Sequence, residues 1–373
     1  MPSVNTSTLR VDTIPPVLLS VIPPAAGTYS FGSQLRFTVR FNEPMVYAGA
    51  PFVLLTGIVG GILGPVPRRV VAISGSGTDT LVFAYTVQSG ERATQVGLVK
   101  VSPKLPARIQ IQVLGNSALS DQAGNTATSL ITAALPLSGV RVDAVIPQAI
   151  GIAGPAGKVY RAGSVLEFTI VWNRPVNVTG IPELEVTIGS VTRIAQYVSG
   201  SGTTLLRFRL VVPSGDNGVV SLARQILLPN GSQILAAGNQ APLAIPQLKG
   251  PQVSVDTVAP SVSKVQLPPA GTYFPGTQLR LVVDFTEVVL VKGSVWIDVL
   301  LGNQVRRFVR TAGCGSRQLI FTSRLTKLDP ELNGLQLPAE ISLANGLISD
   351  LAGNPAKLKL PVMTEANLVI RKR

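Results

Sequence analysis

The sequence predicts an all-β protein made of three tandem antiparallel β-sandwich domains, and three observations support this fold class. A set of sequence landmarks returns three times in the same order along the 373 residues. Short segments alternate apolar and polar residues with a period of two, as in residues 80–87 and 204–211, which is typical of half-buried strands. Because 36 glycines and 29 prolines divide the chain into such segments, we expect strands joined by turns rather than helices.

Each copy opens with an Asp close to a proline, continues to a glycine and a tyrosine, and then enters a long alternating segment. These landmarks occupy residues 11–16, 27–29 and 35–41 in copy one, residues 142–147, 157–160 and 165–171 in copy two, and residues 255–260, 271–273 and 279–285 in copy three. Copies of this length are domain-sized and far longer than solenoid repeats. The expected domains are residues 11–141, 142–254 and 255–373, after an N-terminal extension of residues 1–10.

The first copy carries extra residues. A Gly-Asn pair near the end of each copy, at 124–125, 238–239 and 353–354, recurs at steps of 114 and 115 residues. The opening Asp residues recur at unequal steps of 131 and 113 residues. The additional residues therefore precede the first Gly-Asn pair, and the Gly- and Pro-rich stretch 56–69 is one place for them.

A glycine-rich segment stands between two alternating segments in each copy. It reads Ser-Gly-Ser-Gly-Thr at 74–78 and 199–203, and Ala-Gly-Cys-Gly-Ser at 312–316. We interpret it as a hairpin turn, because glycine adopts positive φ angles without steric cost. The single cysteine, Cys314, lies in the third of these turns and is interpreted as an incidental thiol.

The order of these motifs resembles that of bacterial Ig-like domains. It runs V-D-x-x-x-P, G-x-Y, F-T-V-x-F-x-x-P-V, G-x-P-x-L, Y-V-S-G-S-G-T-x-x-L-x-F, V-x-x-G-D and D-x-A-G-N over residues 11–373, most clearly in copy two. Such modules occur in tandem in large adhesins and other extracellular proteins of bacteria. The resemblance implies an Ig-like sandwich in each copy and an extracellular or cell-surface location, but it implies no ligand.

The composition argues against catalysis. The chain has no histidine, which removes the commonest general base and the commonest zinc ligand, and one cysteine cannot build a metal site. Glu183 and Glu185 share a strand face, where acidic pairs are usually solvated rather than catalytic. We therefore expect a protein that is not an enzyme and has no organic cofactor.

Calcium is the one ion that the motifs suggest. Each copy opens with an Asp at the expected domain joint, and copies one and three close with Asp-x-Ala-Gly-Asn, so carboxylates can converge there. The candidate ligands are Asp121, Asp143, Asp256 and Asp350. The alternative is structural, with the opening Asp capping its proline-containing turn. Because copy two has Leu235 in place of the closing Asp, we expect chelation to change the melting temperature little.

The charge points to anionic partners. The net charge of +13 and the isoelectric point near 10.3 favour acidic polysaccharide or an acidic protein. Nucleic acid is disfavoured, since aromatic residues make up only 5% of the chain and no reader motif is present. The candidate contacts are Arg68, Arg69, Arg193, Arg306, Arg307 and Arg310, and the alternative is that they form a solvated strand face.

Two function classes fit these observations. The first is a non-catalytic extracellular structural protein that assembles into, or spaces, a surface layer, sheath or filament, through self-association or contact with other surface proteins. The second is an adhesin or binding module for an anionic glycan or a protein. The mean hydropathy of +0.38 is high for a rod exposed to water, which favours the assembling subunit. An enzyme accessory domain is a more distant third.

Overall fold

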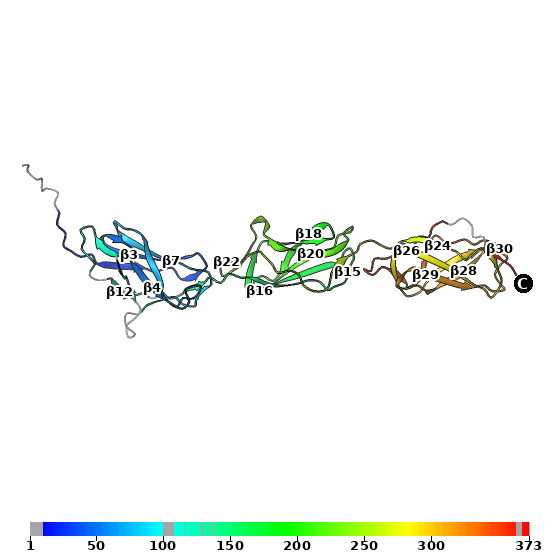
Figure 1. The fold of residues 1–373 in the computed structure, drawn as a ribbon, viewed down its shortest axis with the longest axis horizontal. Coiled ribbons are helices and arrows are strands. Elements are labelled where there is room, and N and C mark those ends of the chain that lie inside the picture. Colours follow the sequence, from blue (N-terminus) through cyan, green and yellow to red (C-terminus); the bar gives the residue numbers. More distant parts are fainter. Residues whose placement is uncertain are drawn as a thin grey trace, which may run out of the picture.

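The computed structural model describes residues 10–99, 108–115, 117–127, 130–135, 137–362 and 368–372, and strands dominate it. The only helical element within these ranges is the single 3-10 turn η1 (Pro229–Gly231). Figure 1 shows three β-rich bodies that follow one another along the long axis of the molecule. The predicted all-β, antiparallel fold class is confirmed.

The strands fall into three groups that match the three sequence copies. The first group is β1 (Leu18–Ile22), β2 (Gly27–Tyr29), β3 (Gln34–Ala48), β4 (Phe52–Thr56), β5 (Val59–Gly60), β6 (Arg68–Ser74), β7 (Thr78–Thr86), β8 (Glu91–Ala93), β9 (Gly97–Leu98), β10 (Arg108–Gln110), β11 (Ala118–Asp121), β12 (Ile131–Ala134) and β13 (Val140–Asp143). The second is β14 (Ala149–Ala153), β15 (Val159–Tyr160), β16 (Val165–Thr179), β17 (Glu183–Ile188), β18 (Val191–Ser199), β19 (Thr203–Val211), β20 (Gly218–Leu227), β21 (Gln233–Ala236), β22 (Asn239–Gln240) and β23 (Ser254–Val255). The third is β24 (Val262–Gln266), β25 (Gly271–Tyr273), β26 (Gln278–Lys292), β27 (Val295–Leu301), β28 (Gln304–Ala312), β29 (Ser316–Arg324), β30 (Leu332–Asn333), β31 (Ser342–Leu343), β32 (Leu347–Ser349) and β33 (Leu368–Ile370).

One long strand organises each group. β3, β16 and β26 each have 15 residues, and each pairs along its first half with the strand that follows the glycine-rich turn, namely β7, β19 or β29. The register then shifts, and the second half pairs with β11, β21 or β32. In the first two groups a proline, Pro44 or Pro175, stands inside the shift. Since proline lacks the N–H that a sheet ladder needs, it belongs at such a break.

Each group also contains one parallel strand pair, which the antiparallel expectation does not include. The short strand with the glycine–tyrosine motif runs parallel to the last strand of its group: β2 with β13, β15 with β23, and β25 with β33. The segment that opens copies two and three therefore completes the sheet of the preceding group.

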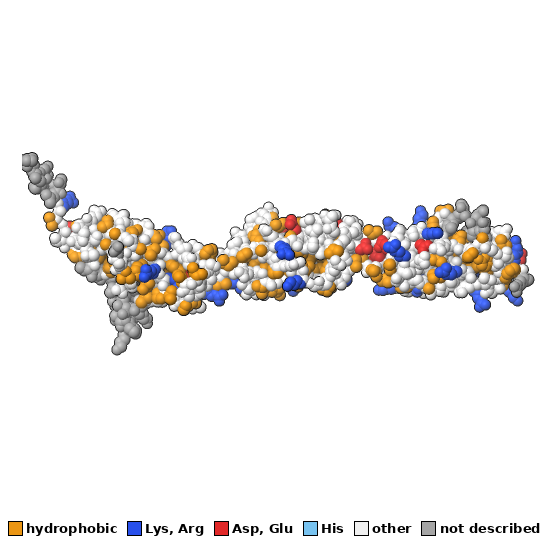
Figure 2. All heavy atoms as spheres, viewed as in Figure 1, with side chains coloured by type: hydrophobic (Ala, Val, Ile, Leu, Met, Phe, Trp, Pro, Cys, Tyr) orange, Lys and Arg blue, Asp and Glu red, His pale blue; other side chains and the backbone are white. Residues whose placement is uncertain are grey.

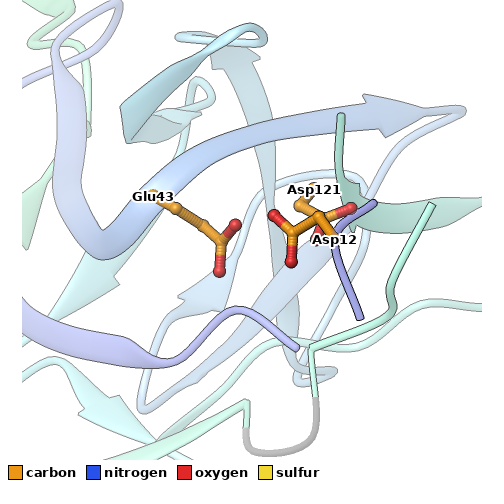
Figure 3. A group of neighbouring side chains, drawn as sticks. All are labelled: Asp12, Glu43 and Asp121. Carbon is orange, nitrogen blue, oxygen red and sulfur yellow. The ribbon is translucent and has the colours of Figure 1, made fainter. Parts of the chain in front are cut away.

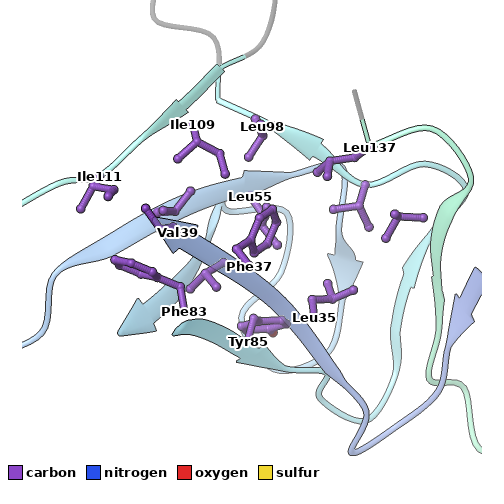
Figure 4. Packing of buried hydrophobic residues seen from close by; sticks show 14 of the residues in the cluster. Leu35, Phe37, Val39, Leu55, Phe83, Tyr85, Leu98, Ile109, Ile111 and Leu137 are labelled. Atoms are coloured by element: carbon purple, nitrogen blue, oxygen red, sulfur yellow. The ribbon is translucent and has the colours of Figure 1, made fainter. Parts of the chain in front are cut away.

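Buried hydrophobic side chains form three separate clusters, one in each group. The alternation predicted for residues 35–41 is confirmed, since Leu35, Phe37, Val39 and Phe41 all belong to the first cluster. Figure 4 shows the first three of them within it. The first cluster extends to Ala144 and the second to Val255, so the joints lie a few residues after the expected boundaries at 141/142 and 254/255.

The glycine-rich turns are hairpins, as predicted. The first glycine of each turn, Gly75, Gly200 or Gly313, has φ near +100°, and a Cβ on it would lie 1.8–2.0 Å from a backbone oxygen of the returning strand. No other residue fits there. Cys314 occupies the position of Ser76 and Ser201, and its sulfur accepts a hydrogen bond from the Val291 amide as those hydroxyls do from Tyr47 and Val178.

The outer strands β1, β14 and β24 each contain a register shift at the same place, between Leu18 and Ser20, Ala149 and Gly151, and Val262 and Lys264. Such bulges disturb the row of backbone groups that an edge strand offers to another chain. Association through these edges is therefore disfavoured.

The surface combines basic and hydrophobic side chains. Figure 2 shows Lys and Arg side chains scattered over all three bodies and acidic side chains gathered beside the joint between the second and third. In the described residues, no helix has the length and apolar character needed to cross a membrane.

We expect a fragment of residues 145–256 to fold alone, because its buried cluster draws only on residues within that range. The measurement is thermal unfolding of the fragment, followed by the fluorescence of Trp172, which is 1% exposed in this cluster. A fragment with no cooperative transition would contradict the division into three domains.

Candidate functional site at the domain joints

The Gly-Asn landmark of each copy binds the segment that opens the same copy. The side-chain Nδ2 of Asn125 donates to the backbone oxygen of Asp12 at 3.0 Å. Asn239 donates in the same way to Asp143, and Asn354 to Asp256, each at 2.8 Å. The recurring asparagine thus attaches the linker to the end of its own domain.

The opening Asp also caps the turn that follows it. The carboxylate of Asp12, Asp143 or Asp256 accepts a hydrogen bond from the backbone N–H two residues later, at 3.0, 3.2 and 3.0 Å. The structural role considered for these residues is therefore present in all three copies. The cap uses one carboxylate oxygen of each Asp, and in Asp143 the second oxygen is bound by Arg174.

Polar contacts cross both joints. In each case a residue one or two positions after the glycine–tyrosine motif of one domain donates a hydrogen bond to the Gly-Asn turn of the next, although the atoms involved differ. At the first joint the Phe31 N–H donates to Asn239 Oδ1 at 2.8 Å, and at the second Arg161 Nη1 donates to the Gly353 oxygen at 2.8 Å. Asn217 adds a contact at the second joint, where its Oδ1 accepts from the Thr257 N–H.

Two of the three domains gather three carboxylates where the linker enters. In the first domain, one oxygen each of Asp12, Glu43 and Asp121 lie within 4.8 Å of one another (Figure 3). In the third, Asp256, Glu287 and Asp350 form the same group. These two clusters are the only groups of three His, Cys, Asp or Glu side chains at this spacing among the residues with described positions.

The candidate ligands included Asp121, Asp256 and Asp350 but not Asp12, Glu43 or Glu287. Both glutamates lie at the middle of the long strand, two residues after Phe41 or Phe285. In copies one and two this position precedes a proline, and the charge of its side chain, acidic in Glu43 and basic in Arg174, is the signal that was available.

Electrostatics differ among the members of each cluster. Burial raises the pKa of Glu287, and so do the nearby carboxylates of Asp256 and Asp350. Burial acts in the same direction on Asp121, but hydrogen bonds from the Asn125 side chain and backbone outweigh it and lower the pKa of Asp121. Among the described residues Glu287 forms no ion pair, and Arg317 is a basic group whose charge opposes the rise in its pKa. A bound cation would therefore stabilise the charged form of Glu287.

At the first joint an arginine side chain, Arg174, takes the place of the carboxylate cluster. Arg174 stands where the other domains have Glu43 and Glu287, and Leu235 stands where they have Asp121 and Asp350. The Arg174 guanidinium binds both carboxylate oxygens of Asp143 and also donates to the Val145 oxygen at 2.7 Å. It lowers the pKa of Asp143 by hydrogen bonding. Asp143 therefore lies in an ion pair and not with the other calcium candidates.

The two clusters have the chemistry of a calcium site. Calcium takes carboxylate and carbonyl oxygens in flexible geometry, and sites in extracellular modules bind at about 10⁻⁴–10⁻³ M. Asp256 and Glu287 line a shallow pocket at the second joint, so an ion reaches them from solvent. A cation there would bridge the linker to the third domain, as Arg174 does in the second.

Four of the six arginine candidates have acidic partners, and three of these pairs follow one pattern. In these three the arginine pairs with an acidic residue 23 positions later: Arg68 with Glu91, Arg193 with Asp216, and Arg306 with Asp329. Glu91, Asp216 and Asp329 are at most 2% exposed. This corrects the hypothesis for Arg68, which at 1% exposure cannot meet an anionic partner, and it assigns Arg193 and Arg306 a structural role.

The other three arginines lie nearer the surface. Arg69 is exposed and stacks on the Phe52 ring at 4.5 Å. Arg307 stacks on the Trp296 ring at 4.3 Å and binds Asp298. Arg310, on β28, is part-buried and forms no ion pair with the described residues. Of the original candidates, only Arg69 and Arg310 carry a charge without an acidic partner in this part of the chain.

Comparison with known proteins identifies no family. No family model matches the chain, and no curated protein matches it. Among solved structures it is similar to the titin domains Z1Z2 in complex with telethonin, with 15% identity, a TM-score of 0.19, and 60% of this chain and 97% of that chain covered. It is also similar to the S-layer protein rSbsC, with 12% identity, a TM-score of 0.20, and 92% and 55% covered. Likenesses this remote say nothing of function.

We expect Glu91→Ala to destabilise the first domain by about 3–5 kcal/mol, because it leaves the buried Arg68 charge uncompensated. Both tryptophans lie outside this domain, at positions 172 and 296. Circular dichroism should therefore show an early transition that tryptophan fluorescence does not. Asp79→Ala, which breaks the exposed pair with Arg40, is the control and should leave both signals unchanged. Equal effects of the two variants would contradict the assignment.

With Glu287 in the cluster, we now expect removal of calcium to lower the melting temperature of the third domain. Millimolar Ca²⁺ should raise the melting temperature reported by Trp296 by a few degrees, and Glu287→Gln should abolish that rise. Without divalent cations, folded Glu287 holds its proton more tightly than the unfolded residue, so stability falls as pH rises through its raised pKa. Glu287→Gln should remove this slope and stabilise the metal-free protein at neutral pH.

The control for this experiment is Glu183→Gln, on β17 outside the clusters, which should respond to calcium as the wild type does. In the converse variant, Arg174→Glu with Leu235→Asp rebuilds the three carboxylates at the first joint and should make Trp172 fluorescence sensitive to calcium. A wild-type protein that is indifferent to Ca²⁺ at the second joint would overturn the calcium assignment.

Proposed function

We propose that this chain is a non-catalytic extracellular structural protein, a rod of Ig-like modules that spaces or assembles a surface layer, sheath or filament. The observation that carries the proposal is the joint. The same asparagine and the same linker Asp recur at both joints, and at each joint the preceding domain donates a hydrogen bond to the Gly-Asn turn, so successive modules are attached in a similar way. A chain that served only as a flexible tether would not need these contacts.

The extended arrangement supports the same function. The three bodies lie in a row rather than around a shared cleft (Figure 1). The groupings of ligand-type side chains in the described residues lie where linkers enter domains, which suits a role in stiffening. A calcium ion bound at the second joint would fix the orientation of the third domain relative to the linker. Without the ion, the third domain would move more freely.

The second candidate function is an adhesin or binding module, and one surface of the third domain favours it. On the outer face of the third domain, Arg307 stacks on Trp296 while exposed Val305 and Val309 flank them on β28. Tryptophan and arginine are enriched in the energetic centres of protein interfaces. An adhesin would use such a face for a protein ligand.

Assembly predicts a distinctive response to salt. The net charge of +13 repels identical chains at low ionic strength, so adding salt should promote self-association through apolar surfaces. Sedimentation velocity over a range of salt concentrations measures this. If the partner is an acidic polymer instead, salt should weaken the complex. A monomer that is indifferent to salt and retains no anionic polymer would leave only a spacer.

A further inference from the structure

The insertion in the first domain forms an apolar loop that projects into solvent. Residues 57–67 join β4 to β6, where the other two domains have the tight turns between β17 and β18 and between β27 and β28. This lies in the stretch that the unequal spacing of the copies indicated. The loop contains no charged residue. Its aliphatic side chains include Ile62, 95% exposed, and Val59, Leu63 and Val66, 48–53% exposed.

The conformation of the loop is fixed by a buried anchor and by its glycines. Ile58 is 2% exposed in the first hydrophobic cluster and fastens the start of the loop to the core. Gly57, Gly60, Gly61 and Gly64 all have positive φ angles between +64° and +82°. Other residues would be strained at these positions, and a Cβ on Gly57 or Gly60 would lie 2.5 or 2.4 Å from a backbone oxygen of Gln95 or Gly90. The loop is therefore packed at its base against the first domain, while Ile62 stays exposed.

A buried guanidinium satisfies the carbonyl groups inside the loop. Arg68 donates to the backbone oxygens of Gly60 at 3.1 Å, Gly64 at 2.9 Å and Val66 at 2.6 Å. Its charge is balanced by Glu91, 2.6 Å away, which also accepts from the Tyr85 hydroxyl. The base of the loop is electrically neutral, and these three carbonyls do not depend on water.

Satisfied backbone groups matter most in a medium without water. In hydrocarbon, each unpaired N–H or C=O costs several kcal/mol, and lipid-exposed irregular backbone is not found there. The Arg68 bonds satisfy three carbonyls of this loop, which suits a backbone that lies at the boundary between headgroups and acyl chains while its side chains extend further in. The choice of lipid over protein as the occupant rests on the charge around the loop.

Positive charges flank the loop. Arg69 follows Arg68 on β6 and is exposed, and Arg92 on β8 is exposed and pairs directly with Val59 on β5. With the net charge of +13, these guanidinium groups suit the phosphates of lipid headgroups. Membrane affinity of such segments comes from buried apolar area together with attraction to anionic lipids.

We propose that the loop of residues 57–67 inserts into the surface of an anionic lipid bilayer, with Ile62 and Leu63 among the acyl chains and Arg69 and Arg92 at the headgroups. Among the described residues only the first domain has this loop, and β5 connects it through β8 to β13, so the membrane contact lies beside the first joint. The proposal does not depend on self-assembly, since a monomeric spacer would bind in the same way.

The test is cosedimentation of the full chain with vesicles of phosphatidylcholine, with and without phosphatidylglycerol. Binding should require phosphatidylglycerol and decrease with salt. Ile62→Ser with Leu63→Ser should weaken it at least about tenfold, because two aliphatic side chains no longer enter the bilayer. Val305→Ser with Val309→Ser removes two exposed valines from the third domain and should bind as the wild type does. Circular dichroism checks that all variants fold.

A second variant reports insertion directly. Leu63→Trp should show a blue shift of its fluorescence on adding anionic vesicles, while the wild-type protein, with Trp172 and Trp296 only, should show none. Three results would overturn the proposal: no vesicle binding by the wild type, undiminished binding by Ile62→Ser with Leu63→Ser, or loop-dependent self-association without vesicles. The last would identify a second copy as the occupant.

Discussion

The arrangement of the modules depends on one hydrogen bond, from an asparagine side chain to the backbone oxygen of the linker Asp. It recurs in all three copies at 2.8–3.0 Å. A linker between two domains has few residues with which to define an orientation. Because the asparagine belongs to the rigid end of its own domain, it holds the linker carbonyl in place and thereby positions the Asp carboxylate beside the middle of the long strand.

Once the Asp is held there, the residue at the middle of the long strand decides the chemistry of the joint. Glu43 and Glu287 accumulate negative charge, while Arg174 neutralises it. The same position on the long strand thus carries a negative charge in two domains and a positive charge in the other. The chain therefore contains one joint whose cation is covalently built in and another whose cation, if present, comes from solution.

The sequence predicted the parts of the fold that repeat. Periodicity of two identified the buried face of β3, and the glycine spacing identified turns in which Gly75 and Gly200 approach a backbone oxygen too closely for any side chain. It did not predict the parallel pairing of β13, because pairing between residues more than a hundred positions apart leaves no local pattern. The arginines show the same limit. The sequence pattern predicts a solvated arginine on a strand, because it does not reveal that the segment carrying Glu91 or Asp216 packs against that arginine.

The parallel pair has a mechanical consequence. In the first domain β2 lies near the start of the folded chain and β13 at its end, and the two run in the same direction. The second domain repeats this with β15 and β23, and the third with β25 and β33. Tension applied to the two ends of the rod would pull these strands in opposite directions along their length. All hydrogen bonds of the pair then bear load together in shear, rather than opening one after another, and rupture is governed by the unfolding rate. Short strands placed this way give each module resistance to stretching that its equilibrium stability alone would not provide.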